Sequence, residues 1–311
     1  MGGPVDPALV RVPGPWTHRA VSANGIRIHV VEAGPPDGPL VVLLHGFPEF
    51  WWTWRHQLPA LAGAGFRVVA PDLRGYGDTD KPPRGYDLWT LAGDCAGLIR
   101  ALGERRAHLV GHDWGAVIGW SVAALQPRLV RSLSGLGAPH PLAYRAAVLR
   151  DPLGQGRAGR YAAGFQLPRL PERSLRADAG ARVERILRTW AGPHWPSTPD
   201  FTDAAARYRG AIRISTVAHC ACEYYRWTLR SQVRSDGRSF ARAVAGPVGV
   251  PVLQVHGADD PCVLEATMRR SAAFAAAGLV HHALPGSGHF PHEEEPALVT
   301  SLIRAHLDAA G

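Results

Sequence analysis

The sequence predicts an α/β fold in which a mostly parallel central sheet carries helices on both faces and a helical cap is inserted into the core. From Leu40 onward, short apolar segments alternate with helical periodicity, as in sheets whose parallel strands are joined by crossover helices. This alternation is interrupted and resumes near Pro247. We therefore expect a first core segment over residues 1–140, a helical cap over residues 141–244 and a second core segment over residues 245–311.

The expected elements follow one another along the chain. Two alternating segments joined by Asn24-Gly25 predict a β-hairpin near the start, because Asn-Gly is a strong signal for a two-residue turn. The segment assigned to the cap is rich in Arg, Trp, Tyr and Pro, and its pattern predicts several short helices without a clear buried strand. The expected strands are residues 17–21, 26–32, 40–45, 66–70, 108–111, 129–136, 251–256 and 279–284. One core helix is expected to begin near residue 51, and three others are expected over residues 88–102, 116–125 and 293–307.

The composition is that of a globular protein and argues against several function classes. The hydrophobic fraction of 46% and the charged fraction of 19% are ordinary. The net charge of +8 forms no basic tract, and Lys81 is the single lysine, so we expect no nucleic-acid partner. No apolar run approaches the ~20 residues of a membrane helix, and the start of the chain lacks the order of a signal peptide. We expect a cytoplasmic protein that does not bind a membrane.

The cysteines do not have the spacing of a metal site. Cys220 and Cys222 form a Cys-x-Cys pair that lacks the second ligand pair of a structural zinc site. We expect both to pack as small apolar groups on a cap helix. Cys95 and Cys262 stand alone in the sequence, so a reducing compartment fits all four thiols.

The central motif is Gly111-His112-Asp113-Trp114-Gly115, which lies between a predicted strand and a predicted helix. In a nucleophile elbow the turn is so tight that small residues must flank the nucleophile. Asp113 at the helix N-terminus should stay ionised, because the helix dipole favours an anion there. A carboxylate can attack an sp3 carbon without a base and form an ester. Aspartate at this point can also simply cap a helix, and the later motifs favour the nucleophile.

Hydrolysis of such an ester requires a base and a group that orients it. His289 follows the last predicted strand on a Gly-rich loop, where it could reach Asp113 through one water. Asp260 follows the strand before it and would hold the histidine tautomer. Asp259 is the alternative acid, with turn capping as its ordinary role, and we favour Asp260. His112 is expected to brace a loop.

The loop after the strand at residues 40–45 is expected to complete the site. It reads His45-Gly46-Phe47-Pro48, and in a fold of this kind the N–H of Phe47 would be one oxyanion donor. The N–H of Trp114 would be the other. Trp51 and Trp114 are candidates for an apolar pocket wall, although Trp51 belongs to a Trp-rich stretch that could equally serve helix packing.

These motifs closely resemble the epoxide hydrolase branch of the α/β-hydrolases, and the resemblance extends over nearly the whole chain from about Thr17. It implies the α/β-hydrolase fold with an inserted cap, a monomer or homodimer, no metal or organic cofactor, and a small apolar epoxide as substrate. The matching landmarks are His45-Gly46-Phe47-Pro48-Glu49, Asp72-Leu73-Arg74-Gly75-Tyr76-Gly77, Gly111-His112-Asp113-Trp114-Gly115 and Gly288-His289-Phe290.

Two cap segments resemble those that carry the lid tyrosines of this branch. They are Tyr161-Ala162-Ala163-Gly164-Phe165-Gln166 and Glu223-Tyr224-Tyr225-Arg226-Trp227. The resemblance implies that Tyr161 and Tyr225 bind the epoxide oxygen and protonate it as the ring opens, with Tyr224 as the alternative to Tyr225. An alkoxide leaving group needs such an acid. The Ala-Ala-Gly after Tyr161 and the charge of Glu223 depart from the usual pattern of these segments.

Two other functions compete with epoxide hydrolysis. A haloalkane dehalogenase would share the aspartate nucleophile and the base, but its halide leaving group takes N–H donors instead of a proton. Phe47 offers no side-chain donor, and the loop after Leu136 has no carboxylate that could replace Asp260. A non-catalytic ligand-binding protein on this scaffold would have no reason to keep Asp113, Asp260 and His289 together. The absence of serine from the elbow disfavours an ordinary esterase.

Overall fold

One sheet of eight strands forms the centre of the part of the chain that the computed structural model describes, residues 5–311. Its order is β1-β2-β4-β3-β5-β6-β7-β8, and the pairs from β4 through β8 are parallel. Only the pairs that involve β2 are antiparallel. The predicted fold class is confirmed. The strands are β1 (Thr17–Ala23), β2 (Ile26–Ala33), β3 (Leu40–Leu44), β4 (Arg67–Pro71), β5 (Ala107–His112), β6 (Val130–Leu136), β7 (Val252–Gly257) and β8 (Leu279–Leu284).

The predicted hairpin joins β1 and β2. Asn24 has φ 47° and Gly25 has φ 77°, so both turn residues adopt the left-handed conformation of a type I′ turn. The strands pair directly across this turn, with Ala23 opposite Ile26. The Asn-Gly signal therefore fixes the hairpin register.

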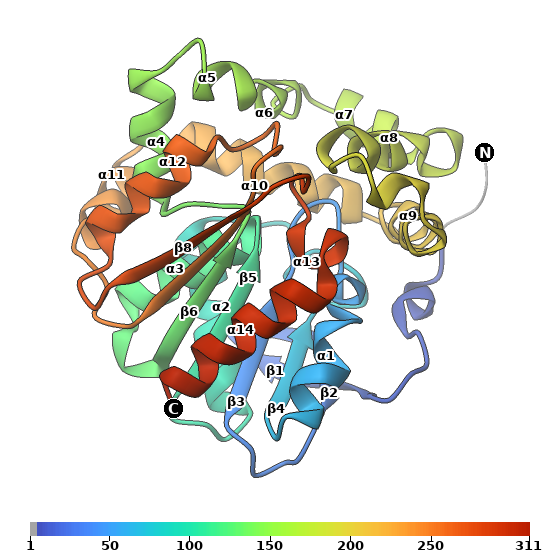
Figure 1. Cartoon of the computed structure of the whole chain (residues 1–311). Helices are drawn as coiled ribbons and strands as arrows, with labels where there is room; N and C mark the ends of the chain where they lie inside the picture. Colours follow the sequence, from blue (N-terminus) through green and yellow to red (C-terminus); the bar gives the residue numbers. More distant parts are fainter. Residues whose placement is uncertain (1–4) are drawn as a thin grey trace.

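Helices cover both faces of the sheet because its central strands are apolar on both sides. β3 and β5 are buried along their whole length, as expected for parallel strands between two helical layers. In Figure 1, α14 lies in front of the sheet and α2 and α3 lie behind it. α1 packs beside α14. These helices are α1 (Gln57–Gly63), α2 (Leu88–Ala101), α3 (Trp114–Leu125) and α14 (Pro296–Ala309).

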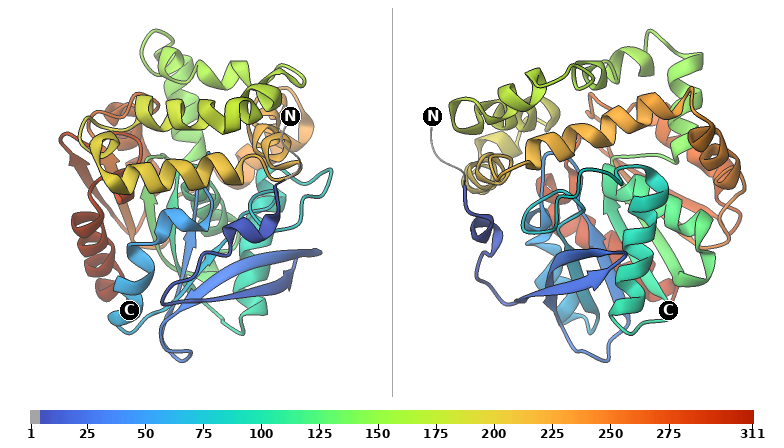
Figure 2. Two further views of the ribbon diagram at one scale, coloured as in Figure 1. Left: turned by 90° about the vertical axis from the view of Figure 1, so that its right-hand side faces the viewer. Right: turned by 180° about the vertical axis from the view of Figure 1, so that it is seen from behind.

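Between β6 and β7 the described chain forms helices and no strand. We call these helices, α4 to α11, the helical layer; it lies across one edge of the sheet in Figures 1 and 2. Two short helices follow in the core, α12 (Glu265–Arg269) and α13 (Pro291–Glu294). The helical layer consists of α4 (Pro141–Arg150), α5 (Gln155–Ala158), α6 (Tyr161–Gly164), α7 (Leu170–Arg176), α8 (Ala181–Trp190), α9 (Pro199–Ala211), α10 (Val217–Ser231) and α11 (Ser235–Ala243).

Two predicted helices differ from the structure. The Trp-rich stretch forms only a 3-10 turn at Trp51–Trp54, and α1 begins after it. The last long helix starts at Pro296 because Glu295, with φ −127° and ψ 57°, breaks the helix after α13. None of the helices in residues 5–311 combines the length and apolar character needed to cross a membrane.

Candidate active site

Asp113 stands on a tight turn between β5 and α3. Its backbone has φ 48° and ψ −116°, a region that L-residues rarely adopt. The turn leaves no room for flanking side chains, since a Cβ at Gly115 would lie 2.0 Å from the carbonyl oxygen of Leu44. The strained backbone and the glycine have the geometry expected of a nucleophile elbow.

The two carboxylate oxygens of Asp113 have different partners. Oδ1 accepts a hydrogen bond from the Phe47 N–H at 3.0 Å, and Oδ2 lies 3.6 Å from Nε2 of His289. Burial alone would raise the pKa of Asp113, but the nearby imidazole of His289 outweighs it and lowers the pKa below its usual value. Asp113 is therefore ionised at neutral pH, with one oxygen held by an amide and the other facing the imidazole.

Asp260, and not its neighbour Asp259, contacts the imidazole of His289. Nδ1 of His289 lies 2.8 Å from Oδ2 of Asp260, whereas Asp259 is exposed. Oδ1 of Asp260 accepts the N–H groups of Cys262 and Val263 at 2.7 and 3.1 Å. Burial lowers the pKa of His289, but the charge of Asp260 and the nearby carboxylate of Asp113 raise it well above the usual value. The ring is thus held between two carboxylates.

The adjacent tyrosines of α10 have different environments. The hydroxyl of Tyr224 donates to the carbonyl of Arg74 at 2.7 Å. The hydroxyl of Tyr225 is buried and has no hydrogen-bond partner in the described chain, and its ring lies 5.1 Å from Trp114 and 6.0 Å from Tyr161. Burial, and for Tyr225 also the charge of Asp113, raises the pKa of Tyr161 and Tyr225 well above 10. Both keep their protons at neutral pH. The indole N–H of Trp114 can only donate to the Tyr225 hydroxyl, so the Tyr225 proton has no acceptor in the described chain.

Aromatic rings from the helical layer pack against Phe47, Tyr225 and His289. Phe165 lies 5.3 Å from Phe47 and 4.7 Å from Tyr225, between ring centroids. Trp190 lies 4.7 Å from Tyr161 and 5.4 Å from His289. We had not assigned Phe165 or Trp190 to the site from the sequence, since neither stands in a motif that distinguishes it from a packing residue.

Comparisons with known proteins show the family of the chain. A family model for the alpha/beta hydrolase fold matches residues 39–296. The chain is 34% identical over 315 residues to Epoxide hydrolase A of Mycobacterium tuberculosis. This alignment covers 94% of this chain and 97% of that protein. The chain belongs to the epoxide hydrolase branch of the α/β-hydrolase superfamily.

Other members of this superfamily and solved structures are similar over comparable lengths. The AB hydrolase superfamily protein YfhM of Bacillus subtilis is 33% identical over 289 residues, covering 92% of this chain and 96% of that one. The crystal structure of Epoxide Hydrolase A from Mycobacterium thermoresistibile superposes with a TM-score of 0.79 at 29% identity, covering 94% and 98% of the two chains. Cfl2 from Burkholderia cenocepacia gives 0.81 at 29% identity, with 97% and 98% covered. The resemblance inferred from the motifs is confirmed.

Trp51, one of the two candidates for the pocket wall, packs against the N-terminal segment. Its indole N–H donates to the carbonyl of Val10 at 2.7 Å, and its ring packs edge-on against Trp16 and His18. We therefore assign it to packing against the N-terminal segment. Trp114, the other candidate, contacts the ring of Tyr225. No hydrogen bond joins the Trp114 N–H to Asp113 in the described chain, so its oxyanion role stays a prediction.

A buried polar network supports the elbow from below. Nδ1 of His112 lies 2.9 Å from Oε2 of Glu49, and its Nε2 lies 2.7 Å from the carbonyl oxygen of His289. The same Glu49 oxygen accepts the N–H of Gly46 at 2.9 Å. Burial lowers the pKa of His112, but the charge of Glu49 outweighs it and raises the pKa. His112 therefore braces the loops that carry Phe47 and His289.

Two buried groups contain residue types that can bind metals. Glu49, His112 and His292 form one, and Asp260, Cys262 and His289 form the other. In each group the carboxylate is already engaged by a backbone amide and a histidine. Hydrogen bonding thus accounts for both arrangements without an ion.

Gln155 links the helical layer to the loop that carries Asp260. Its Nε2 donates to the carbonyl of Cys262 at 2.9 Å, and its Oε1 accepts the N–H of Leu264 at 3.0 Å. The side chain is buried, and this contact was not predicted from the sequence. Because both partners are backbone groups more than a hundred residues away, no local motif could reveal it.

Proposed function

We propose that this chain hydrolyses a small apolar epoxide to a vicinal diol through a covalent ester on Asp113. The observation that carries the proposal is the buried hydroxyl of Tyr225 beside Asp113 and Trp114, whose proton has no acceptor in residues 5–311. A buried O–H without an acceptor is costly, and an epoxide oxygen would satisfy it. The membership of the chain in the epoxide hydrolase branch supports the same substrate class.

In the first half-reaction, Oδ2 of Asp113 attacks an epoxide carbon. The carbon–oxygen bond of the ring breaks, and the electron pair of that bond goes to the epoxide oxygen. A hydroxyl of Tyr161 or Tyr225 gives this oxygen its proton, leaving an ester and a tyrosinate. Oδ2 suits this role because Oδ1 is held by the Phe47 amide.

In the second half-reaction, His289 removes a proton from water and the hydroxide attacks the ester carbonyl. Charge then develops on Oδ1, which the Phe47 N–H already contacts at 3.0 Å, and we assign the Trp114 N–H as a second donor. The ester C–O bond breaks, and the released alkoxide takes the proton of the new Asp113 carboxylic acid, which returns Asp113 to a carboxylate and releases the diol. The proton on His289 then returns to the tyrosinate. Asp260 stabilises the imidazolium formed in between. Neither half-reaction uses a metal or an organic cofactor.

The alternative leaving group, a halide, would need N–H donors. Trp114 carries one buried indole N–H without a partner in the described chain. Phe47 supplies none from its side chain, whereas the two tyrosines can donate protons. The balance of donors favours an oxygen leaving group.

We also assign the helical layer the role of a cap over the site. We further propose that the protein acts as a monomer or homodimer.

The test of substrate class is incubation with a panel of small epoxides and haloalkanes, scoring diol against halide. We expect diol from at least one apolar epoxide and little halide from any haloalkane. Halide release without diol would transfer the assignment to a dehalogenase. Release of neither, together with binding of the panel compounds, would favour a ligand-binding protein.

The ester route has its own test. In a single turnover in H2(18)O, the oxygen added to the diol comes from Asp113, and the heavy label enters the Asp113 carboxylate. Mass spectrometry of the peptide that contains Asp113 should therefore gain label while the first diol does not. Label found directly in the first diol would indicate attack of water on the epoxide and overturn the ester route.

A further inference from the structure

The positive charge of the chain is concentrated around the helical layer. Residues 141–244 contain 18 arginines and 8 acidic residues, a net charge of +10, whereas the rest of the chain has a net charge of −2. Several of these arginines are paired; Arg188, Arg207 and Arg226 each contact a carboxylate of the same layer. The unpaired ones create a field that attracts anions.

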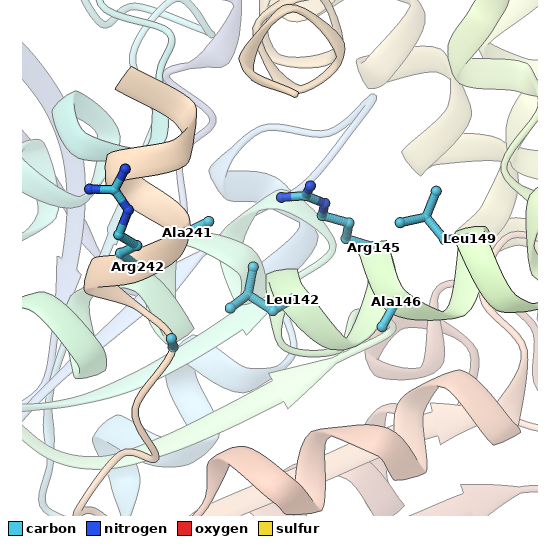
Figure 3. Close-up of a pocket in the computed structure, with 7 residues that line it drawn as sticks. Leu142, Arg145, Ala146, Leu149, Ala241 and Arg242 are labelled. Carbon is cyan, nitrogen blue, oxygen red and sulfur yellow. The ribbon is translucent and has the colours of Figure 1, made fainter. Parts of the chain in front are cut away.

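Two unpaired arginines flank an open hollow of about 370 Å³ between α4 and α11. In Figure 3 the guanidinium groups of Arg145 and Arg242 extend to the same side, with Leu142 and Ala241 between them and Leu149 farther along α4. We call this hollow the α4/α11 groove. It is lined by Leu142, Arg145, Ala146, Leu149, Ala241, Arg242 and Ala245.

The groove lies on the face of α4 that is turned away from the reaction centre. Residues 142, 145, 146 and 149 share one helical face, because they are spaced by three or four residues. Tyr144 points the opposite way, close to Gly159 of the α5 turn and within reach of the charges of Asp113 and Asp260. The α4 helix thus separates the groove from the candidate active site.

Neither groove arginine has a carboxylate within 4.0 Å in residues 5–311. The acidic residues at the ends of these helices are engaged elsewhere, since Asp151 accepts the N–H of Gly154 and Asp236 pairs with Arg234. Leu149 is 72% exposed on the same surface. Two free guanidinium groups next to exposed apolar side chains call for a ligand that has an anionic end and an apolar end.

We propose that the α4/α11 groove binds a free single-chain alkyl carboxylate at a site separate from the reaction centre. The carboxylate pairs with Arg145 and Arg242, whose planar guanidinium groups match its two oxygens. The alkyl chain lies along Leu142, Ala146 and Leu149. The hollow is open to solvent, so the alkyl chain lies along its floor with one side exposed.

The binding test uses decanoate below its micelle concentration, titrated into the whole protein by calorimetry. The double change Arg145→Gln and Arg242→Gln should weaken binding about tenfold to a hundredfold, as expected for lost charge-assisted hydrogen bonds. The matched control is Arg150→Gln with Arg238→Gln, which removes the same charge from the same two helices outside the groove. Decanol should bind the parent more weakly than decanoate does. The affinity for decanol should be the same in the parent and in the Arg145→Gln, Arg242→Gln variant.

Hydrogen exchange provides the location. Decanoate should protect peptides from residues 141–150 and 235–243, and Leu149→Ser should reduce this protection. Absence of binding, equal losses in the groove and control variants, or protection confined to the peptides around Asp113 would each overturn the proposal. Binding to phosphatidylglycerol vesicles but not to decanoate, lost in the groove variant, would assign the surface to a membrane and overturn it as well.

Discussion

Nδ1 of His289 lies 2.8 Å from Oδ2 of Asp260, while Nε2 of the same ring lies 3.6 Å from Oδ2 of Asp113. The His289 ring therefore faces two carboxylates with different proposed roles. Asp260 orients the ring, whereas Asp113 loses its own negative charge when it is esterified in the proposed reaction. In the free protein the charge of Asp113 helps to raise the pKa of His289. Once Asp113 is esterified that charge is gone, and the imidazole becomes a stronger candidate for a neutral base.

Replacing the nucleophile should remove turnover without unfolding the protein. Asp113→Asn keeps the size of the side chain, but an amide does not attack carbon at a useful rate. We expect no steady-state diol formation together with a circular dichroism spectrum like that of the parent. Intact mass must exclude deamidation back to Asp. Full activity in a verified variant would contradict the mechanism.

The same variant should lower the pKa of His289. Burial depresses this pKa, and Asp260 and Asp113 raise it, so loss of the Asp113 charge moves it down. A raised folded-state pKa stabilises the protein below the ordinary histidine pKa of ~6.5, and that stabilisation is lost as the pH rises through the folded-state value. The stability advantage of the parent over Asp113→Asn should therefore shrink with rising pH. Histidine NMR titration and urea unfolding would measure both effects, and an unchanged pKa would contradict the coupling.

His289→Gln should stop the proposed second half-reaction and spare the first. Attack by Asp113 needs no base, whereas hydrolysis of its ester does. Rapid mixing with a reactive epoxide should add the mass of the epoxide to the peptide that contains Asp113. His219→Gln is the matched control, because His219 is an exposed histidine of α10. Continuous diol release by His289→Gln would remove His289 from its assigned role.

The tyrosine assignment predicts a difference between neighbours on α10. Tyr161→Phe with Tyr225→Phe keeps both rings and removes both hydroxyls, so epoxide opening should fall by about 10²–10⁴-fold, the usual contribution of a positioned acid. Each single change should have a smaller effect, because one hydroxyl remains. Tyr224→Phe loses the bond to the Arg74 carbonyl and should lower stability more than rate. Parent-like epoxide opening by the double variant would reduce Tyr161 and Tyr225 to packing residues.

The sequence predicted the parts of the site that stand at strand ends. Asp113, Asp260 and His289 each follow a strand in a recognisable turn, and parallel strands bring their carboxyl ends to one edge. The sequence left Tyr224 and Tyr225 as alternatives, since adjacent positions on a helix point about 100° apart. It also left Trp51 between the pocket wall and packing, because a run of tryptophans does not indicate which way each ring turns.

Gln155 was missed for a different physical reason. It pairs with backbone groups of Cys262 and Leu264. Nearly every residue type offers such groups, so the identity of the partner residues does not indicate the contact. The hollow lined by both α4 and α11 is equally invisible from the sequence, because the two segments are far apart along the chain. Contacts between the helical layer and the core therefore had to come from the structure.

The Gln155 contact makes a prediction about the coupling of the helical layer to the reaction. Gln155→Met keeps the length of the side chain but leaves the Leu264 N–H and the Cys262 carbonyl without partners, at a cost of about 1–3 kcal/mol for each buried group. The loop that includes Asp260 should then move more freely. Because Asp260 orients the base, ester hydrolysis should slow while ester formation stays near the parent rate.

This split distinguishes a positioning role from general destabilisation. Intact mass during turnover should reveal more ester on Gln155→Met than on the parent, in addition to a lower free energy of unfolding. Gln166→Met is the control, since the Gln166 amide donates to carbonyls of Ala162 and Tyr225 within the helical layer and does not reach the Asp260 loop. It should lower stability without accumulating ester. Equal ester levels in both variants and the parent would leave Gln155 as a packing contact, because a residue that positions Asp260 must act on the step that needs the base.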